Sequence, residues 1–331
     1  MRHVTPGRLV ALGLVLFVAA FTLWAVPSSE YIFLPDRAHP VAPLVRVAGG
    51  ETQDDGGGIY FVDVRYRKAT LLERLLGGRL HEGADLKKPE VVNEPGLNET
   101  AQRRVDLAEM QLSQKVAAAV ALRSLGKKVQ TREAGALISA VQPGFPAAGK
   151  IEPLDVIEAV DGKPVRTPGG LAHAMAGKRV GDPVSFRVRR GTKTTLVTLK
   201  TVRSPQSGGA VVGIVIDQAT QIQLPLRVTI NLADVGGPSA GLAFALDVLE
   251  ELGKNVDRGH RIAATGEMHL DGSVGPIGGV KQKTIGARRA GVDAFLVPAG
   301  DNAREARKYA HGLRIIPVKS FQQALRALAT L

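Results

Sequence analysis

A serine in a glycine-rich turn, between an apolar strand and an apolar helix, is the feature that most constrains this chain. The apolar run Leu226–Leu232 predicts a strand, and the Ala/Leu-rich run Pro238–Leu252 predicts a helix that begins with a favoured proline. Between them, Gly236 and Gly237 carry no side chains that would block a substrate from Ser239. Free N–H groups and the positive end of the helix dipole suit an oxyanion there.

The turn alone has three interpretations. Ser239 could be a nucleophile, or it could simply help to start the helix. The loop could instead cradle a phosphate, as glycine-rich helix starts often do. Because short glycine motifs recur by chance, a second stretch of sequence is needed to choose between them.

The second stretch is Thr265–Thr284, which reads TGEMHLDGSVGPIGGVKQKT. Its Thr-Gly-Glu turn and its Pro-Ile-Gly-Gly followed by two lysines, together with the Gly-Pro-Ser-Ala-Gly turn, resemble the Ser–Lys catalytic core of the Lon protease family. The resemblance covers roughly Leu226–Leu331. It implies that Ser239 is the nucleophile, that Lys283 is its general base, and that Thr265 holds the amine through its hydroxyl. The alternative for Thr265 is an ordinary residue at a strand end.

Helix geometry selects the same lysine independently. A helix that begins near Gly279 places four side chains on one face by its three-and-four spacing: Val280, Lys283, Thr284 and Ala287. Lys281 shares the other, solvated side with Arg288. A buried Lys283 also fits the chemistry, because an amine takes the proton of a serine only when it is neutral. Burial must therefore lower its pKa from about 10.4 towards about 7–8.

The sequence also contains one departure from the Lon pattern and two competing candidate sites. Lon relatives with an attached ATPase often carry an acidic residue three positions before the serine, where this chain has Gly236. A triad of Ser239, His269 and Asp271 has suitable residue types, and only geometry can exclude it. The His81-Glu82 pair lacks a second histidine at helical spacing, so it does not predict a metal site. No metal and no cofactor is expected.

Residues 121–203 form a separate predicted unit. Its order of strands resembles a bacterial-type PDZ domain, and the likeness is carried by the segments Pro146–Gly149, Asp155–Ile157 and Asp161–Val165. Such domains add a peptide C-terminus as a strand and capture its carboxylate in a backbone nest. The candidate nest is the loop of Leu125, Gly126 and Lys127, for which a helix C-cap at Gly126 is the alternative.

Composition excludes several classes of function. With no cysteine, disulfides, thiol catalysis and cysteine-ligated metals are excluded. The net charge of +12 comes from scattered basic residues, and only 4% of residues are aromatic, so the charge predicts a solvated surface and no nucleic-acid partner. The sequence has no G-x-x-x-x-G-K-[ST] phosphate loop, so ATP-driven unfolding is not expected of it.

The N-terminal sequence predicts a membrane anchor. The run Leu9–Val26 has no formal charge and would be about 27 Å long as a helix, close to the thickness of the hydrocarbon core. Basic residues precede it, so the positive-inside rule predicts a single-pass protein of the cell membrane with residues 1–8 cytoplasmic and the catalytic part extracytoplasmic. The proline- and glycine-containing segment 27–57 predicts an extended tether.

The predicted fold class is α+β. It consists of the N-terminal transmembrane helix, a segment 58–120 that packs with the proteolytic domain, the PDZ-like β-rich domain 121–203, and a Lon-type proteolytic domain 210–331 with a mixed sheet and helices. Because the strand at Ile59–Tyr66 is apolar enough to join that sheet, the PDZ-like unit is expected to be an insertion.

The resemblances together predict an ATP-independent, membrane-anchored serine endopeptidase with a Ser–Lys dyad. It would cleave flexible or misfolded proteins that the PDZ-like domain selects. The alternative is a catalytically silent membrane scaffold that binds protein C-termini. The expected partners are protein or peptide substrates, the membrane, and further copies of the chain, because related proteolytic domains assemble as rings, of which a hexamer is one form.

Overall fold

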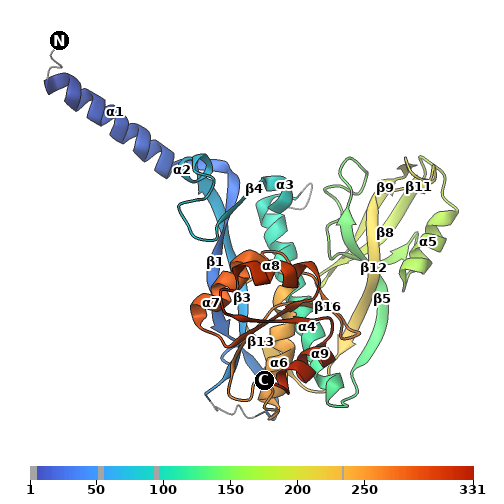
Figure 1. The fold of residues 1–331 in the computed structure, drawn as a ribbon. Helices are drawn as coiled ribbons and strands as arrows, with labels where there is room; N and C mark the ends of the chain where they lie inside the picture. Colours follow the sequence, from blue (N-terminus) through green and yellow to red (C-terminus); the bar gives the residue numbers. More distant parts are fainter. Residues whose placement is uncertain (1–5, 51–55, 93–96, 233–234) are drawn as a thin grey trace.

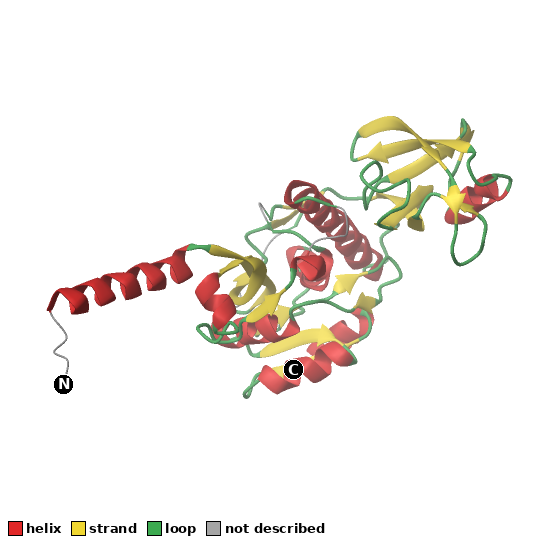
Figure 2. Ribbon diagram, turned by 90° about the horizontal axis from the view of Figure 1, so that it is seen from above, coloured by secondary structure: helices red, strands yellow, loops and turns green. Residues whose placement is uncertain are grey.

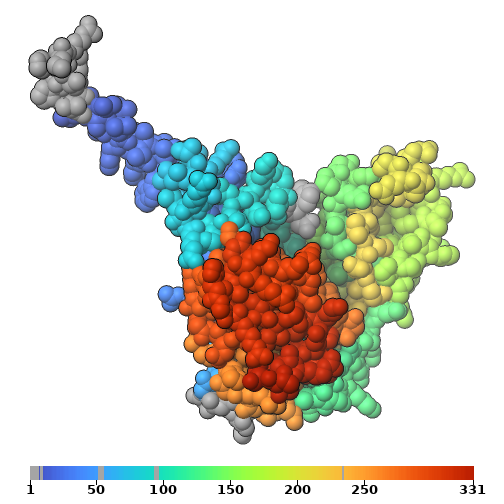
Figure 3. Space-filling view, viewed as in Figure 1, coloured from blue at the N-terminus to red at the C-terminus, as the bar shows by residue number. Residues whose placement is uncertain are grey.

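The computed structural model describes residues 6–50, 56–92, 97–232 and 235–331. Figure 1 shows a larger body in which strands that follow α1 lie beside the C-terminal elements, a smaller β-rich unit next to it, and helix α1 (Pro6–Ala25) pointing away. In Figure 2 the β-rich unit and α1 leave the larger body on different sides. Figure 3 shows the N-terminal segments, in blue to cyan, packed directly on the C-terminal elements in orange and red.

A mixed sheet is the framework of the larger body. Within the described residues it has six strands in the order β18-β17-β14-β3-β1-β4. Their bounds are β1 Pro27–Pro40, β3 Gly58–Thr70, β4 Asp85–Lys87, β14 Arg261–Ala264, β17 Ala294–Pro298 and β18 Arg314–Val318. Strand β3 pairs in parallel with β14 and antiparallel with β1. The N-terminal strands β1, β3 and β4 therefore belong to the same sheet as the C-terminal strands.

Helices cover both faces of this sheet because its strands are apolar on both sides. On one face lie α4 (Glu99–Ser124), the short helix η1 (Pro238–Ala240) and α6 (Gly241–Glu251), with α9 (Phe321–Leu328) joining the same core. On the other face lie α7 (Val280–Ala290) and α8 (Asp301–Tyr309). The remaining short elements of this body are β2 Val45–Val47, α2 Leu71–Leu75, α3 Pro89–Val92, β13 Val228–Ile230, β15 Glu267–Met268 and β16 Val274–Gly275.

Residues 27–57 do not form the tether that the sequence predicts. Most of them belong to β1 and to β2, which pairs with β13. The prolines fit this strand structure, because Pro27 and Pro40 lie at the ends of β1 and Pro35 lies at the register shift before Ala38, positions that do not require a ladder N–H. Residues 51–55 lie outside the described residues.

The predicted transmembrane helix is wrong. Helix α1 contains Leu9–Ala25 of the charge-free run, and β1 begins directly after the run, at Pro27. Over the part of the chain that the structure describes, no helix has both the length and the apolarity that crossing a membrane requires. The prediction of a single-pass cell-membrane protein with a cytoplasmic N-terminus and an extracytoplasmic catalytic part is therefore wrong as well.

The smaller unit is a twisted sheet with one helix. Its described strands follow the order β12-β5-β6-β8-β9, with β7 paired to β6. The bounds are β5 Gln130–Val141, β6 Val156–Val160, β7 Lys163–Pro164, β8 Pro183–Arg190, β9 Lys193–Lys200, β10 Val202–Arg203, β11 Ala210–Val211, β12 Ile214–Gln223 and α5 Pro168–Ala176. Asp161 and Gly162 both have positive φ, as the predicted Asp-Gly hairpin requires. The chain enters this unit after α4 and returns along β12.

Candidate active site

The structure brings together the serine and the lysine that the sequence selects. Lys283 Nζ donates hydrogen bonds to Ser239 Oγ at 2.6 Å and to Thr265 Oγ1 at 3.2 Å. Lys283 is 3% exposed and Thr265 is fully buried, whereas Ser239 keeps partial access to solvent. A buried amine thus faces a hydroxyl that a substrate can reach.

The turn before the serine needs both of its glycines. Gly237 has φ +85°, a conformation that side chains disfavour, and a Cβ built on it would meet nothing within 4 Å. A Cβ at Gly236 would lie 2.7 Å from Asp106 Cβ on α4, so an acidic side chain does not fit at this position. The Gly237 N–H donates to the Asp106 carbonyl at 2.9 Å and is therefore already occupied.

Hydrogen bonds from neighbouring elements fix the serine turn. The Ser113 hydroxyl of α4 donates to the Pro238 carbonyl at 2.9 Å. Thr265 Oγ1 and the Gly266 N–H both donate to the Ser239 carbonyl, at 3.0 Å and 2.8 Å. Because the Thr265 proton goes to that carbonyl, a lone pair of its oxygen remains to accept from the amine. One threonine therefore orients both members of the dyad.

Helix α7 aims Lys283 inward, as the helical spacing predicts. Gly279 caps the helix in the left-handed conformation, and the face that contains Lys283 is buried. Lys281 projects from another side and donates to Asp85 Oδ1 at 2.9 Å. It is partly buried by this ion pair, so it is less solvated than the sequence suggests.

Burial gives Lys283 the electrostatics of a base. Desolvation lowers its pKa from 10.5 to about 8, and the negative charge of Asp63 opposes part of that fall. A lysine with such a pKa has a useful neutral fraction near neutral pH, which general-base chemistry needs. The 2.6 Å separation from Ser239 Oγ lets the neutral amine accept the hydroxyl proton directly.

The side chains of the alternative triad, Ser239, His269 and Asp271, have other neighbours. Asp271 accepts from the N–H and the hydroxyl of Ser273, at 2.8 Å and 2.7 Å, which satisfies its Oδ1 within its own turn. His269 lies against Gly275. Ser239 Oγ instead has Lys283 as its side-chain partner. The geometry favours the lysine as base.

The predicted carboxylate nest lies at the end of α4. The N–H groups of Leu125 and Lys127 donate to the Leu122 carbonyl, and the Gly126 N–H donates to the Arg123 carbonyl. Gly126 has φ +73°, so the loop has the geometry of the alternative interpretation, a helix C-cap. Its role in peptide binding remains a prediction, without support from these three donors.

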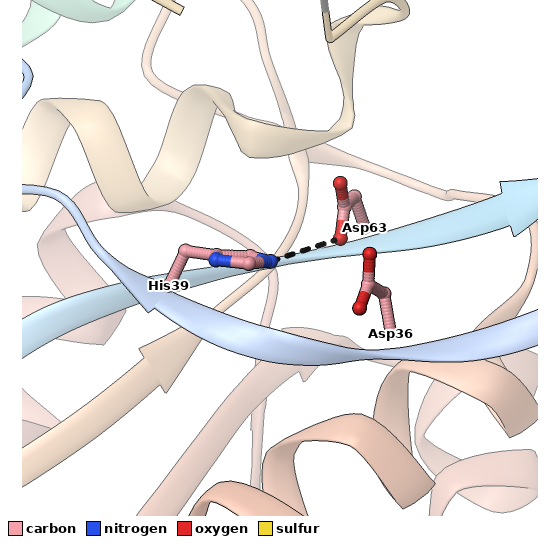
Figure 4. Close-up of side chains that lie close together, drawn as sticks. All are labelled: Asp36, His39 and Asp63. Atoms are coloured by element: carbon pink, nitrogen blue, oxygen red, sulfur yellow. Dashed lines mark ion pairs between the residues drawn. The ribbon is translucent and has the colours of Figure 1, made fainter.

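One group of described residues has ligand atoms close enough together for a metal ion: Asp36, His39 and Asp63, within 4.8 Å of one another (Figure 4). These residues already have charged neighbours. Arg65 donates to both oxygens of Asp36, and His39 Nε2 lies 3.8 Å from Asp63 Oδ1. A cation would compete with the guanidinium, so the group fits a network of ion pairs better than a metal centre.

Sequence reasoning missed three residues of the site: Asp63, Asp106 and Ser113. Asp63 had a readable signal, because it continues the inward alternation of Ile59 and Phe61 in an apolar strand. Asp106 and Ser113 had none, since they act through a backbone carbonyl and a hydroxyl on a helix distant in sequence.

Comparisons with known proteins agree with this geometry. Residues 212–330 match the Lon protease (S16) C-terminal proteolytic domain, and this segment contains Ser239, Thr265 and Lys283. This chain carries a Lon-type proteolytic domain. Residues 124–201 match the PDZ domain family.

Named relatives are similar over the same part of the chain. The Lon protease of Buchnera aphidicola subsp. Schizaphis graminum is 41% identical over 93 residues, which are 27% of this chain and 12% of that protein. Lon protease 2 of Bacillus subtilis is 37% identical over 91 residues, which are 28% of this chain and 16% of that protein. The chain thus spans less than a fifth of the length of these relatives. The matches to the Lon-type proteolytic domain support a serine endopeptidase.

Solved structures of PDZ domains are similar to about a quarter of this chain. The PDZ domain of the SdrC-like protein from Listeria innocua has 26% sequence identity and covers 25% of this chain and 92% of its own, with a TM-score of 0.24. At that score the likeness supports no conclusion about the whole chain. The assignment of a PDZ domain rests on the family match to residues 124–201.

Proposed function

We propose that this protein is an ATP-independent endopeptidase that uses Ser239 as nucleophile and Lys283 as general base. The observation that carries the proposal is a buried amine 2.6 Å from a partly exposed hydroxyl. Ser239 Oγ attacks the scissile carbonyl carbon while neutral Lys283 takes its proton. The resulting ammonium then protonates the leaving amine, and the same lysine later activates the water that hydrolyses the acyl-enzyme.

The oxyanion is stabilised by the backbone at the start of α6. Gly237 is a poor donor for this purpose, because its N–H is held by the Asp106 carbonyl. The Ser239 N–H, which follows Pro238 in η1, is the better candidate, and the positive end of the helix dipole acts in the same direction. The Thr265 hydroxyl bonds both the Lys283 amine and the Ser239 carbonyl, so it fixes their relative positions.

Substrates are flexible or misfolded protein segments. The sequence has no phosphate loop of the Walker type, so unfolding of stable substrates is not driven by this chain. The PDZ domain selects peptides by adding them to a sheet edge. Of the described strands, β12 pairs only with β5, and α5 packs beside it, which leaves an edge next to a helix where a strand can bind. Assembly into a homo-oligomeric ring is proposed from the resemblance alone.

The test is hydrolysis of an unfolded protein without ATP by the full chain. Ser239→Ala and Lys283→Ala are each expected to lower the rate about a thousandfold or more. Lys281→Ala is the matched control on the same helix and keeps the wild-type rate. Cleavage that survives in both dyad variants contradicts the proposal. If the wild-type chain binds peptide C-termini but does not cleave the unfolded protein, the result would favour the tail-binding scaffold.

A further inference from the structure

Asp63 lies on the face of β3 that points towards the serine. Ile59 and Phe61 belong to the core beneath α6, and the Phe61 ring lies 6.3 Å from that of Phe244. Asp63 is the next residue on this face, since side chains alternate along a strand. Strand β14 ends at Ala264, which pairs with Phe61. Asp63 therefore lies just past the point where β3 loses its neighbour.

Lys283 reaches the serine past the same end of β14. Helix α7 packs on the opposite face of the sheet, with Gly279 against Val64 and Gly286 against Val62. Lys283 lies between these two contacts on one stripe of the helix. Its Nζ nevertheless bonds Ser239 and Thr265 on the α6 side, so its side chain must pass beside β3.

The charges of the two side chains act on each other. The Asp63 carboxylate raises the pKa of Lys283, against the effect of burial, and Lys283 lowers the pKa of Asp63. Burial and the neighbouring Asp36 raise the pKa of Asp63, while His39 lowers it. Arg65 binds Asp36 from the solvent side. The charged groups around Asp63 thus come from β1, β3 and α7.

Asp63 also has an unused acceptor. Its Oδ1 is buried and has no hydrogen-bond partner among the described residues, although His39 Nε2 lies 3.8 Å away, as the dashed line in Figure 4 marks. A buried carboxylate oxygen without a donor is costly and needs an explanation. A positive charge that forms transiently near Asp63, when the amine of Lys283 is protonated, explains why this oxygen is left without a donor.

We propose that Asp63 is a positioning residue for Lys283. The Asp63 carboxylate stabilises the ammonium that forms when the Lys283 amine takes the Ser239 proton. The arrangement is a lysine counterpart of the Ser-His-Asp triad, in which a buried carboxylate supports the protonated base without exchanging a proton with it. His39 stacks on Phe61 with 5.4 Å between the ring centroids, and its Nε2 lies 3.8 Å from the Asp63 carboxylate. The inference rests on the proposed function of the dyad.

The direction of the expected effect follows from charge. Asp63→Asn removes a negative charge near the amine, so the pKa of Lys283 falls further. The base then stays neutral to lower pH, and the acid limb of the kcat/KM profile, which reports groups of the free enzyme, moves down by about one pH unit. On the plateau kcat falls about tenfold, because the ammonium in the transition state loses its counter-charge.

The experiment measures kcat/KM and kcat for an unstructured reporter peptide across the pH range, with the full chain and no ATP. Asp63→Asn is compared with Asp63→Glu, which keeps the charge and is expected to keep the limb at the wild-type pH. Asp63→Ser replaces the asparagine variant should the latter unfold. A lower kcat with an unmoved limb in the charge-removing variant overturns the proposal, since a purely structural role predicts that result.

Two further variants separate the sources of failure. His39→Gln is expected to keep an acid limb, and loss of the limb in this variant would assign it to the imidazole and contradict the proposal. Ser239→Ala tests the dyad itself. Cleavage that depends on Ser239 but shows no shift with Asp63→Asn overturns only the role of Asp63, whereas cleavage without Ser239 overturns the proposed function.

Discussion

Lys283 and Asp247 are two buried ionisable residues of the same domain, and burial shifts their pKa values in opposite directions. Desolvation lowers the pKa of Lys283 to about 8 and raises that of Asp247 on α6 to about 8. Their partners differ. The amine has Ser239 and Thr265 within hydrogen-bond distance, whereas Asp247 Oδ2 has no partner among the described residues.

The difference shows when desolvation becomes useful. Near the serine, a group kept neutral by burial faces the atom whose proton it must take, so the shift serves chemistry. At Asp247 the nearby carboxylates of Glu250, Glu251 and Asp257 add to the shift, and Arg46 opposes it. There the same physics only makes stability depend on pH.

Replacing Lys283 by arginine removes the neutral base from the dyad and has the largest expected effect on activity. A guanidinium stays protonated at any working pH and cannot accept the proton of Ser239. We expect kcat/KM for an unstructured peptide to fall about a thousandfold or more. Lys281→Arg is the matched control and keeps the wild-type rate. Normal cleavage by Lys283→Arg would contradict the role of the lysine as base.

Thr265→Val removes the shared partner of the dyad while keeping the shape of the side chain. The amine loses an acceptor and the Ser239 carbonyl loses a donor, so we expect kcat to fall about tenfold to a hundredfold. Thr284→Val is the control, because the Thr284 hydroxyl donates within α7, to the Val280 carbonyl. Equal rates for the two variants would show that the threonine does not orient the dyad.

Asp247→Asn tests the other buried group of the comparison, whose raised pKa affects stability and not catalysis. Because the pKa is raised in the folded state, this carboxyl contributes stability that is fully present below about pH 4 and is lost as the pH rises through about 8. Asparagine does not titrate. The free energy of unfolding of the variant, measured in urea, should therefore rise relative to that of the wild type between about pH 5 and about pH 8, by a margin of up to about 4 kcal/mol at about 1.4 kcal/mol per pH unit. A margin that is the same at pH 5 and pH 8, as is expected for exposed Asp217→Asn, would refute this account.

Lys281→Ala is expected to have the smallest effect. This lysine lies two residues from Lys283, but its partner is a carboxylate near the surface, Asp85, at 2.9 Å. Such pairs contribute about 0–1 kcal/mol, so the free energy of unfolding should change by no more than that. Activity should stay at the wild-type level. A large loss of activity would mean that inward and outward lysines of α7 are not functionally distinct.

The sequence predicted the site best where a single geometric rule determined the structure of a single helix or turn. The three-and-four spacing on α7 selected Lys283 over Lys281, because a short amphipathic helix has one buried face. The glycines before Ser239 marked the turn, because close approach to α4 leaves no room for a Cβ at Gly236. Both signals are local in sequence, and both needed only backbone geometry.

Other features depended on contacts that no local pattern reveals. The prolines of residues 27–57 suggest a tether, yet β1 gains two strand partners in β3 and β4. The charge-free run at the N-terminus suggested a span, but no helix among the described residues has both the length and the apolarity that a span requires. Gly126 suits both a carboxylate nest and a helix C-cap, and its loop has the hydrogen bonds of a cap, so its role in peptide binding stays a prediction.

The most direct test of the central claim is the pH dependence of Ser239-dependent peptide hydrolysis in the wild type and in Lys283→Ala. A base must lose its proton before it can act, so kcat/KM should rise with pH through an acid limb near about 8, the pKa of the buried amine. The residual rate of Lys283→Ala should lack that limb. A limb near about 6.5, the usual histidine value, that persists in Lys283→Ala would contradict the account.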